Sequence, residues 1–232
     1  MTQQASGRPI KTAALLVNLG SPEQPTVSAV RRFLKDFLGD PRVVNIPRPI
    51  WWIILNCFVL PFRPRKALHA YKSIWTEKGS PLTYLTRQLT EQVAKILAEQ
   101  SIHVEYAMSY STPRIETQLR QFKENGVEHV VVLPLYPQFS STTTASVFDS
   151  VVNEYKRWKS IPSLSFISDY YADDGYISAL AESIKAARNG DNNALLLMSF
   201  HGLPAQLSKW GDPYERQCHQ TAELLAGKLG LD

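Results

Sequence analysis

Ala194-Leu195-Leu196-Leu197-Met198 runs directly into Ser199-Phe200-His201-Gly202-Leu203-Pro204, and this stretch decides how the fold is interpreted. The aliphatic run has the length and composition of a buried β-strand, and the Gly and Pro that follow it are typical of a turn. In open α/β sheets, ligands bind at the carboxyl ends of the strands. Imidazole exchanges protons near neutral pH and also binds metal ions. The stretch therefore predicts a strand that carries His201 into a site; a turn histidine bonded to nearby backbone is the alternative.

The composition is that of a globular protein from a reducing compartment. A chain of 232 residues that is 44% hydrophobic suffices for one large domain or one and a half ordinary ones. Cys57 and Cys218 lie far apart and form no CxxC pair, which argues against a disulfide framework, a structural zinc site or a cysteine-held cluster. Residues 1–11 contain no apolar core of a secretory signal. We therefore expect a cytoplasmic protein.

Charge is unevenly distributed along the chain. Residues 1–100 carry a net charge of +8, whereas residues 101–232 carry −4. The basic half suits a nucleic acid, an anionic lipid surface or an acidic small molecule. It contains no helix-turn-helix, zinc-finger or RNA-binding aromatic motif, so we expect no nucleic-acid partner.

Apolar, β-branched runs alternate with segments of helical period, and this alternation predicts a doubly wound α/β fold with parallel sheets. The expected strands are Thr12–Asn18, His103–Met108, Val130–Leu135, Leu164–Ser168 and Ala194–Met198. The expected helices are Val27–Leu38, Leu82–Gln100, Ile115–Asn125, Ser146–Trp158, Gly175–Arg188 and Tyr214–Leu229.

The first and last expected strands begin alike, each an aliphatic run that enters a turn rich in Gly and Pro. This similarity predicts two Rossmann-like domains, a first at 8–170 and a partial second at 171–232. A single strand-helix-strand-helix unit leaves a sheet edge uncovered. We therefore expect the second domain to be incomplete and the chain to be truncated at its C-terminus. A chance likeness between two Leu-rich strands is the alternative.

Residues 50–62 form a 13-residue apolar run inside a segment at about 47–66 that we call the apolar lip. The run is too short to span a bilayer, which takes about 20 residues. Prolines on both sides predict that it is not the middle of a long helix. Arg63, Arg65 and Lys66 follow it. It is either a core helix with a solvated basic end, or a lip for a flat apolar ligand bearing carboxylates or for an anionic membrane surface.

Two polar stretches precede expected helices. Ser140-Ser141-Thr142-Thr143-Thr144 is expected to cap the helix after the third strand. Binding of an anion at that helix N-terminus is the alternative. Asp173-Asp174 is expected to cap the following helix, where the helix dipole favours negative charge.

Five motifs follow one another along the chain: Leu16-Val17-Asn18-Leu19-Gly20-Ser21-Pro22, Gly79-Ser80-Pro81-Leu82, Leu135-Tyr136-Pro137-Gln138-Phe139-Ser140, Ser199-Phe200-His201-Gly202-Leu203-Pro204 and Gly211-Asp212-Pro213-Tyr214. They occur in the order and rough spacing of ferrochelatases, and with them the chain resembles that family from about Thr12 to Leu231. The resemblance is to bacterial protoporphyrin ferrochelatases. It implies two Rossmann-like domains and a lyase-type metal chelatase that inserts Fe²⁺ into protoporphyrin IX, the last step of haem biosynthesis, with release of two protons.

The resemblance also implies the site residues. The histidine of the fourth motif, His201, is the catalytic residue, in a porphyrin cleft between the two domains. Whether its imidazole accepts a proton or binds the metal stays open, with the proton acceptor favoured. The residues implied to bind the substrate are Leu19 and Tyr110 against the macrocycle, and Arg63, Lys66 and Ser80 at the propionates.

The chain departs from the family pattern at three points. Ser109 stands where many relatives have an Arg that is suited to handling metal or carboxylate. The loop after Tyr136-Pro137-Gln138 has no Cys, so we expect no iron–sulfur cluster and no tightly bound cofactor, with Fe²⁺ as a substrate. The family's second catalytic carboxylate comes from a later motif and is not assigned to any residue here.

Two other functions remain open at this point. One is a non-catalytic porphyrin- or haem-binding fragment, because a chain without the second carboxylate can bind the ring without turning it over. A cobalt or nickel chelatase acts on a more polar tetrapyrrole, which the apolar pair Trp51-Trp52 does not suit. We expect protoporphyrin IX and Fe²⁺ as partners, together with peripheral contact with a membrane surface.

Overall fold

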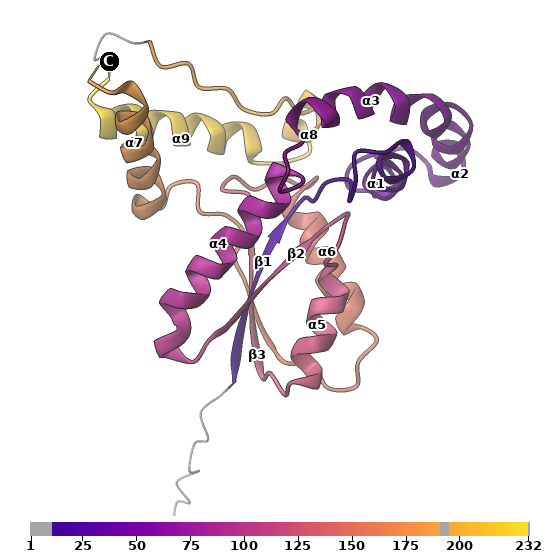
Figure 1. Cartoon of the computed structure of the whole chain (residues 1–232), viewed down its shortest axis with the longest axis horizontal. Coiled ribbons are helices and arrows are strands. Elements are labelled where there is room, and N and C mark those ends of the chain that lie inside the picture. Colours follow the sequence, from indigo (N-terminus) through magenta and orange to yellow (C-terminus); the bar gives the residue numbers. More distant parts are fainter. Residues whose placement is uncertain (1–10, 191–194, 232) are drawn as a thin grey trace, which may run out of the picture. The chain divides into compact units, whose positions relative to one another are not determined.

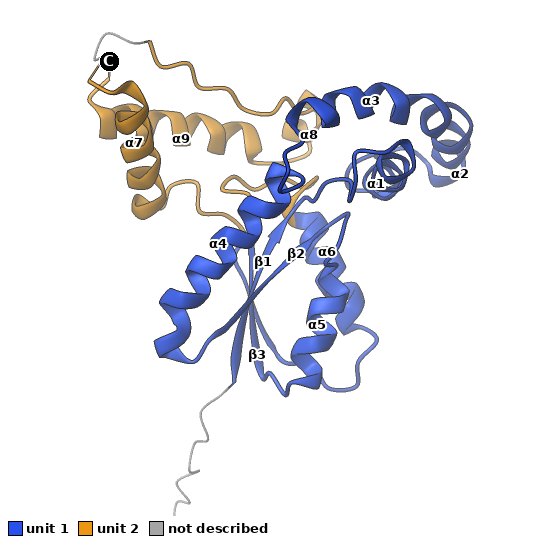
Figure 2. Cartoon of the chain, viewed as in Figure 1, with its two compact units in different colours: residues 1–135, 145–167 blue, residues 136–144, 168–232 orange. Residues whose placement is uncertain are grey.

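The computed structural model describes residues 11–190 and 195–231, and the chain divides into two compact units (Figure 2). Unit 1 comprises Met1–Leu135 and Ala145–Ile167, and unit 2 comprises Tyr136–Thr144 and Ser168–Asp232. The domain boundaries expected from the sequence, 8–170 and 171–232, stay predictions.

The elements are labelled in chain order in Figure 1. They are β1 (Thr12–Asn18), α1 (Val27–Gly39), α2 (Arg48–Ile53), the π-helical turn η1 (Ile54–Val59), α3 (Leu60–Ile74), α4 (Pro81–Leu97), the 3₁₀ turn η2 (Ala98–Gln100), β2 (His103–Met108), α5 (Ile115–Glu124), β3 (His129–Pro134), α6 (Thr144–Tyr155), β4 (Ser163–Phe166), α7 (Asp174–Arg188), α8 (Ala205–Lys209) and α9 (Tyr214–Leu229).

The sheet of unit 1 confirms the predicted fold class. Its four strands are all parallel, in the order β2-β1-β3-β4. In β1, Val17 pairs with Ala107 of β2 on one edge and with Pro134 of β3 on the other. Helix α4 covers one face of the sheet, and α5 and α6 cover the other (Figure 1). Parallel strands covered on both faces are buried, and Leu15 and Val17 are fully buried as a result.

Helix boundaries follow the capping residues. Thr26 accepts a hydrogen bond from the Ala29 amide and starts α1, and Asp173 accepts one from the Tyr176 amide and starts α7, as predicted. Helix α9 has the predicted bounds, between Pro213 and Gly230, whose left-handed φ of +66° closes it.

The apolar lip corrects a prediction. Residues 48–74 form one uninterrupted helical run through α2, η1 and α3, so the prolines do not end it. In an α-helix, Pro61 would collide with the carbonyl four residues earlier. The wider turn η1, in which the Leu60 amide bonds to the Leu55 carbonyl, accommodates the proline.

The π turn also decides which side of the run is buried. Leu55 and Leu60 are both buried although they are five residues apart, a spacing that points to different faces in a regular α-helix. They join α1 and Tyr110 in one apolar cluster of unit 1, whose buried members are Val30, Phe33, Leu34, Leu38, Leu55, Leu60 and Tyr110.

The expected strand Ala194–Met198 is not confirmed. Ala194 lies outside the described residues, and Leu195–Met198 has no strand structure. Leu195 is 93% exposed and Leu197 is 85% exposed. A strand needs a neighbour to bond its amides and carbonyls, and the described part of unit 2 contains no strand that could pair with it.

Candidate functional site

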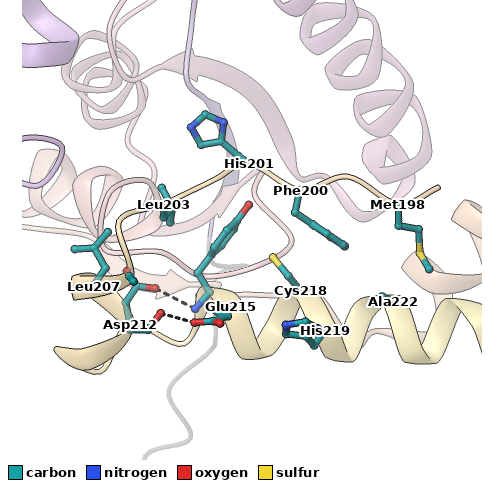
Figure 3. Close-up of a pocket in the computed structure, with 13 residues that line it drawn as sticks. Met198, Phe200, His201, Leu203, Leu207, Asp212, Glu215, Cys218, His219 and Ala222 are labelled. Atoms are coloured by element: carbon teal, nitrogen blue, oxygen red, sulfur yellow. Dashed lines mark hydrogen bonds between the residues drawn. The ribbon is translucent and has the colours of Figure 1, made fainter.

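A pocket of about 540 Å³ in unit 2 contains the histidine singled out by the sequence (Figure 3). Its volume lies within the range of about 300–1,000 Å³ that is usual for small-molecule sites. One wall is the extended segment 198–203, and the other walls are α8 and the first half of α9. The lining combines apolar side chains with imidazole, carboxylate, phenol and thiol groups: Met198, Phe200, His201, Leu203, Ala205, Leu207, Ser208, Asp212, Tyr214, Glu215, Cys218, His219 and Ala222.

His201 is exposed, and its position does not depend on a strand. The ring of His201 points away from α9, whereas Phe200, the preceding residue, points toward α9 (Figure 3). Consecutive side chains of an extended segment alternate in direction, so one residue packs on the helix while the next stays accessible. The arrangement leaves the imidazole free to meet a ligand.

Tyr214 fastens the histidine segment to α9. Its hydroxyl bonds to the backbone of His201 and to the side chain of Cys218, one turn further along α9. Burial is the main cause that raises the pKa of Tyr214 to about 12. Burial likewise raises the pKa of the Cys218 thiol. In the absence of a metal ion, both groups are therefore protonated at neutral pH.

The hydroxyl-rich stretch after β3 binds an anion supplied by the chain itself. The Ser141 amide and hydroxyl each donate to Oδ2 of Asp212 at 2.7 Å, and the Ser140 hydroxyl donates at 3.1 Å. The other carboxylate oxygen accepts the Tyr214 amide at 3.0 Å. Asp212 thus joins two of the sequence motifs within unit 2. The sequence offered a signal, since donors in one motif match a carboxylate in another, but neither motif alone reveals the bond.

The described residues contain no preformed metal cage. No three His, Cys, Asp or Glu side chains among residues 11–190 and 195–231 lie close enough together to hold a metal ion.

Unit 1 brings together two of the predicted substrate-binding residues. The Tyr110 amide donates to the Leu19 carbonyl at 3.1 Å, so the segments that follow β1 and β2 lie side by side. Both stand at the carboxyl end of the sheet, where α/β proteins bind ligands. Tyr110 also lines a pocket of about 330 Å³, together with Ser111 and Arg114.

Tyr110 is held by residues that the sequence did not single out. Its hydroxyl donates to Oδ2 of Asp40 at 2.7 Å and lies 2.9 Å from the Ser146 hydroxyl. Ser146 also donates to Asp40. These contacts join residues 70 and 106 positions apart in the chain, so no local pattern could reveal them.

The predicted propionate-binding residues differ in accessibility. Arg63 and Lys66 are exposed on α3, and none of the ion pairs within the described parts of the chain includes either of them. Beside them, Phe62 is 70% exposed. Ser80, in contrast, is buried where α4 begins.

Ser109, which replaces the arginine of many relatives, adds no charge to the end of β2. Its hydroxyl oxygen is buried without a hydrogen-bond partner. A buried hydroxyl without a hydrogen-bond partner lowers the stability of the fold, because it has lost its bonds to water. Such a group calls for an explanation, for example a hydrogen bond to a bound ligand.

Comparison with known proteins identifies the family. The family model described as Ferrochelatase matches residues 11–232. Over 95% of this chain, a ferrochelatase from a Polaromonas species is 49% identical. A ferrochelatase from Thioalkalivibrio sulfidiphilus is 48% identical over 97% of this chain. One from Methylococcus capsulatus is 48% identical over 95% of this chain. The chain covers 61%, 62% and 67% of these three proteins, so it spans about three fifths to two thirds of their length.

Proposed function

The chain belongs to the ferrochelatase family, and we propose that it inserts Fe²⁺ into protoporphyrin IX to form protohaem, as a lyase-type metal chelatase. The match of residues 11–232 to the family carries this proposal. All five sequence motifs fall within the matched range, including the segment with His201.

The reaction needs a proton acceptor and a metal-binding group. Two pyrrole N–H bonds break, Fe–N bonds form, two protons leave, and no electron is transferred. His201 accepts one pyrrole proton as general base, and the second proton passes to solvent. Binding of Fe²⁺ by the neutral imidazole is the alternative role, because a ring that has taken the proton no longer offers that nitrogen to the metal. The pyrrole nitrogens of the porphyrin supply the further iron ligands.

The substrate is held by apolar contact and by cations. Leu19 and Tyr110 contact the macrocycle, and Arg63 and Lys66 bind the propionates. Arginine suits a carboxylate because its donors form a planar fork. Exposure of Arg63 and Lys66 beside Phe62 supports this role, whereas the buried Ser80 reaches a propionate only if the start of α4 shifts.

Anaerobic mixing with protoporphyrin IX and Fe²⁺ tests the proposal through the porphyrin absorption and fluorescence spectra. We expect metallation by the native chain, and bound but unmetallated porphyrin with His201→Ala. His103→Ala is the matched control, because His103 is an exposed histidine at the start of β2, and it should metallate normally. Normal turnover by His201→Ala contradicts the assigned role.

The same assay separates the two other functions. A native chain that binds protoporphyrin without metallating it is a porphyrin-binding protein. A chain that ignores protoporphyrin but loads Co²⁺ or Ni²⁺ into a carboxylate-rich tetrapyrrole is the other kind of chelatase.

A membrane surface is the second proposed contact, for a protein that is cytoplasmic and peripheral. Trp52 and Phe58 are each 65% exposed and lie on the same helical run as Arg63 and Lys66. Exposed aromatic side chains with nearby cations favour an anionic lipid surface. Among the described residues, no helix has the length and apolar character needed to cross a bilayer.

Sedimentation with phosphatidylglycerol vesicles tests this contact. Trp52→Ser should lower the bound fraction. Trp210→Ser is the control, since Trp210 is 61% exposed in unit 2, outside the apolar lip. Equal losses in both variants, or none in Trp52→Ser, contradict a membrane-binding lip.

The protein is proposed to need no tightly bound cofactor and no iron–sulfur cluster. Cys57 and Cys218 lie in different units and are both free thiols. Anaerobically purified protein should contain no acid-labile sulfide and no visible absorption. A stoichiometric cluster would overturn this.

A further inference from the structure

The end of α1 connects the apolar lip with the chain around Tyr110. The Trp51 indole donates to the Leu38 carbonyl at 2.6 Å, and the Arg48 guanidinium donates to the Gly39 carbonyl at 2.5 Å. These carbonyls belong to the last turn of the helix, where donors and cations are favourable. Asp40 follows at once and accepts the Tyr110 hydroxyl.

Asp40 is held at both carboxylate oxygens. Oδ2 accepts the hydroxyls of Tyr110 and Ser146, and Oδ1 accepts the Arg42 amide at 2.7 Å. Hydrogen bonds to an ionised acceptor are shorter and stronger than neutral ones. The carboxylate therefore has one orientation and imposes it on the Tyr110 hydroxyl.

Tyr110 transmits this position to the predicted substrate contacts. Its ring packs edge-on against Phe37 with 5.3 Å between ring centroids, in the same cluster as Leu55 and Leu60 of the lip. Its backbone amide is bonded to the Leu19 carbonyl. Within unit 1, Tyr110 thus contacts three parts of the proposed site: the backbone at Leu19, the apolar cluster of the lip and the carboxylate of Asp40.

We infer that Asp40 is a positioning residue for tetrapyrrole binding: it fixes Tyr110 and, through the end of α1, the apolar lip in the arrangement that receives the ring. The inference rests on the proposed function, because that function assigns Leu19, Tyr110 and the lip to the tetrapyrrole. Asp40 acts through Tyr110 and takes no part in proton transfer.

A double-mutant cycle on protoporphyrin IX affinity tests the inference. Asp40→Asn, which keeps the shape of the side chain but removes its charge, should weaken the affinity about tenfold, the effect of losing one charge-assisted hydrogen bond. Tyr110→Phe should weaken it similarly. The double variant should be no weaker than either single variant, because both remove the same interaction. Additive losses, or unchanged affinity in Asp40→Asn, would overturn the inference.

Asp149→Asn is the matched control. Asp149 forms a two-point ion pair with the Arg42 side chain, at 2.8 and 3.2 Å, on the exposed side of the same region. The variant removes a carboxylate close to Asp40 in space without touching Tyr110, and should leave the affinity unchanged. A tenfold loss here would mean that any charge in the region matters, against a specific role for Asp40.

A second readout does not depend on porphyrin. In protein labelled with ¹³C at tyrosine Cζ, the Tyr110 resonance, identified by its loss in Tyr110→Phe, should move in Asp40→Asn and stay in place in Asp149→Asn. An unmoved resonance overturns the positioning role even if porphyrin binds. If the Tyr110 resonance moves in Asp40→Asn but the native chain does not bind protoporphyrin, the proposed function is refuted instead. Asp40 then has a purely structural role.

Discussion

The segments Thr12–Asn18 and Leu195–Met198 have similar aliphatic sequences and different structures. The first is β1, paired on both edges and buried in the centre of the unit 1 sheet. The second is extended without strand pairing, and Leu195 and Leu197 face solvent. Apolar character alone thus does not make a strand; a neighbouring strand is also required. Unit 1 is organised around a sheet, whereas the described part of unit 2 is organised around α7, α9 and polar contacts.

The comparison of the two segments predicts its largest effect on stability when their leucines are replaced by alanine. Leu15→Ala should lower the free energy of unfolding of unit 1 by about 2–5 kcal/mol, because it opens a cavity in a buried core. Leu197→Ala should change the stability by less than about 0.5 kcal/mol, because the side chain is 85% exposed. Urea denaturation, followed separately in each unit, measures the change in the free energy of unfolding for the two variants. Similar losses in the two variants would remove the distinction between the segments.

Unit 2 should be most sensitive at Asp212. Asp212→Asn weakens the bonds from Ser140, Ser141 and the Tyr214 amide, and should lower the free energy of local opening by about 2 kcal/mol. Hydrogen exchange of the Ser141 and Tyr214 amides measures this opening. Glu215→Gln is the control, since the Glu215 carboxylate accepts an exposed hydrogen bond from the Ser208 hydroxyl at 2.8 Å. Unchanged exchange in Asp212→Asn would show that polar contacts do not hold unit 2.

An ion pair between the buried Glu154 and the half-exposed Arg120 should make unit 1 sensitive to pH. The Glu154 side chain is only 3% exposed, and its hydrogen bond with Arg120 lowers the pKa of the carboxyl. The folded-state pKa is below the unfolded one, so this stability is present above the ordinary pKa of glutamate and is lost as the pH falls through the folded-state pKa. Glu154→Gln should cost about 1 kcal/mol at pH 7 and nothing in strong acid. Urea unfolding across pH measures the difference, and a cost that grows toward acid pH contradicts the assignment.

The smallest effect is expected at the exposed pair of unit 2. Lys228 donates to Asp174 at 2.7 Å and lowers the pKa of that carboxyl, but the Asp174 side chain is 86% exposed. Solvent and salt screen such a pair. Asp174→Asn should therefore leave the melting temperature unchanged at low and at high salt. A salt-dependent fall would show that unit 2 relies on surface charge.

The sequence predicted the parts of the fold that local patterns control. The four strands of the unit 1 sheet and the flanking helices were confirmed within about three residues, because apolar periodicity and capping residues mark them. Helix α9 is the clearest case, since Pro213 and Gly230 bound it. The strand at Leu195–Met198 was wrong because pairing depends on a partner that the pattern of one segment does not contain. The continuous lip helix was missed because Pro61 follows a π turn that tolerates it, and because Pro64 lies inside α3, where proline is ordinarily unfavourable.

The candidate site was predictable only as separate pieces. The motifs identified His201 and the stretch around Ser140, and the resemblance identified Tyr110, but Asp40 and Ser146 belong to no quoted motif. Their contacts are set by tertiary packing between distant parts of unit 1. The bond between Asp212 and Ser141 likewise spans 71 positions, although both residues lay in stretches already singled out.

The π turn η1 adds a residue to the helical run, and one residue of an α-helix corresponds to a rotation of about 100°. Everything after the turn is rotated by that amount relative to α2. Deleting Asn56 and replacing Pro61 with Ala, so that a regular turn can form, would carry Phe62 and Arg63 around the axis, away from the side on which they are now exposed. The winding of this one turn, and not the composition of the lip alone, thus decides which side chains the lip exposes.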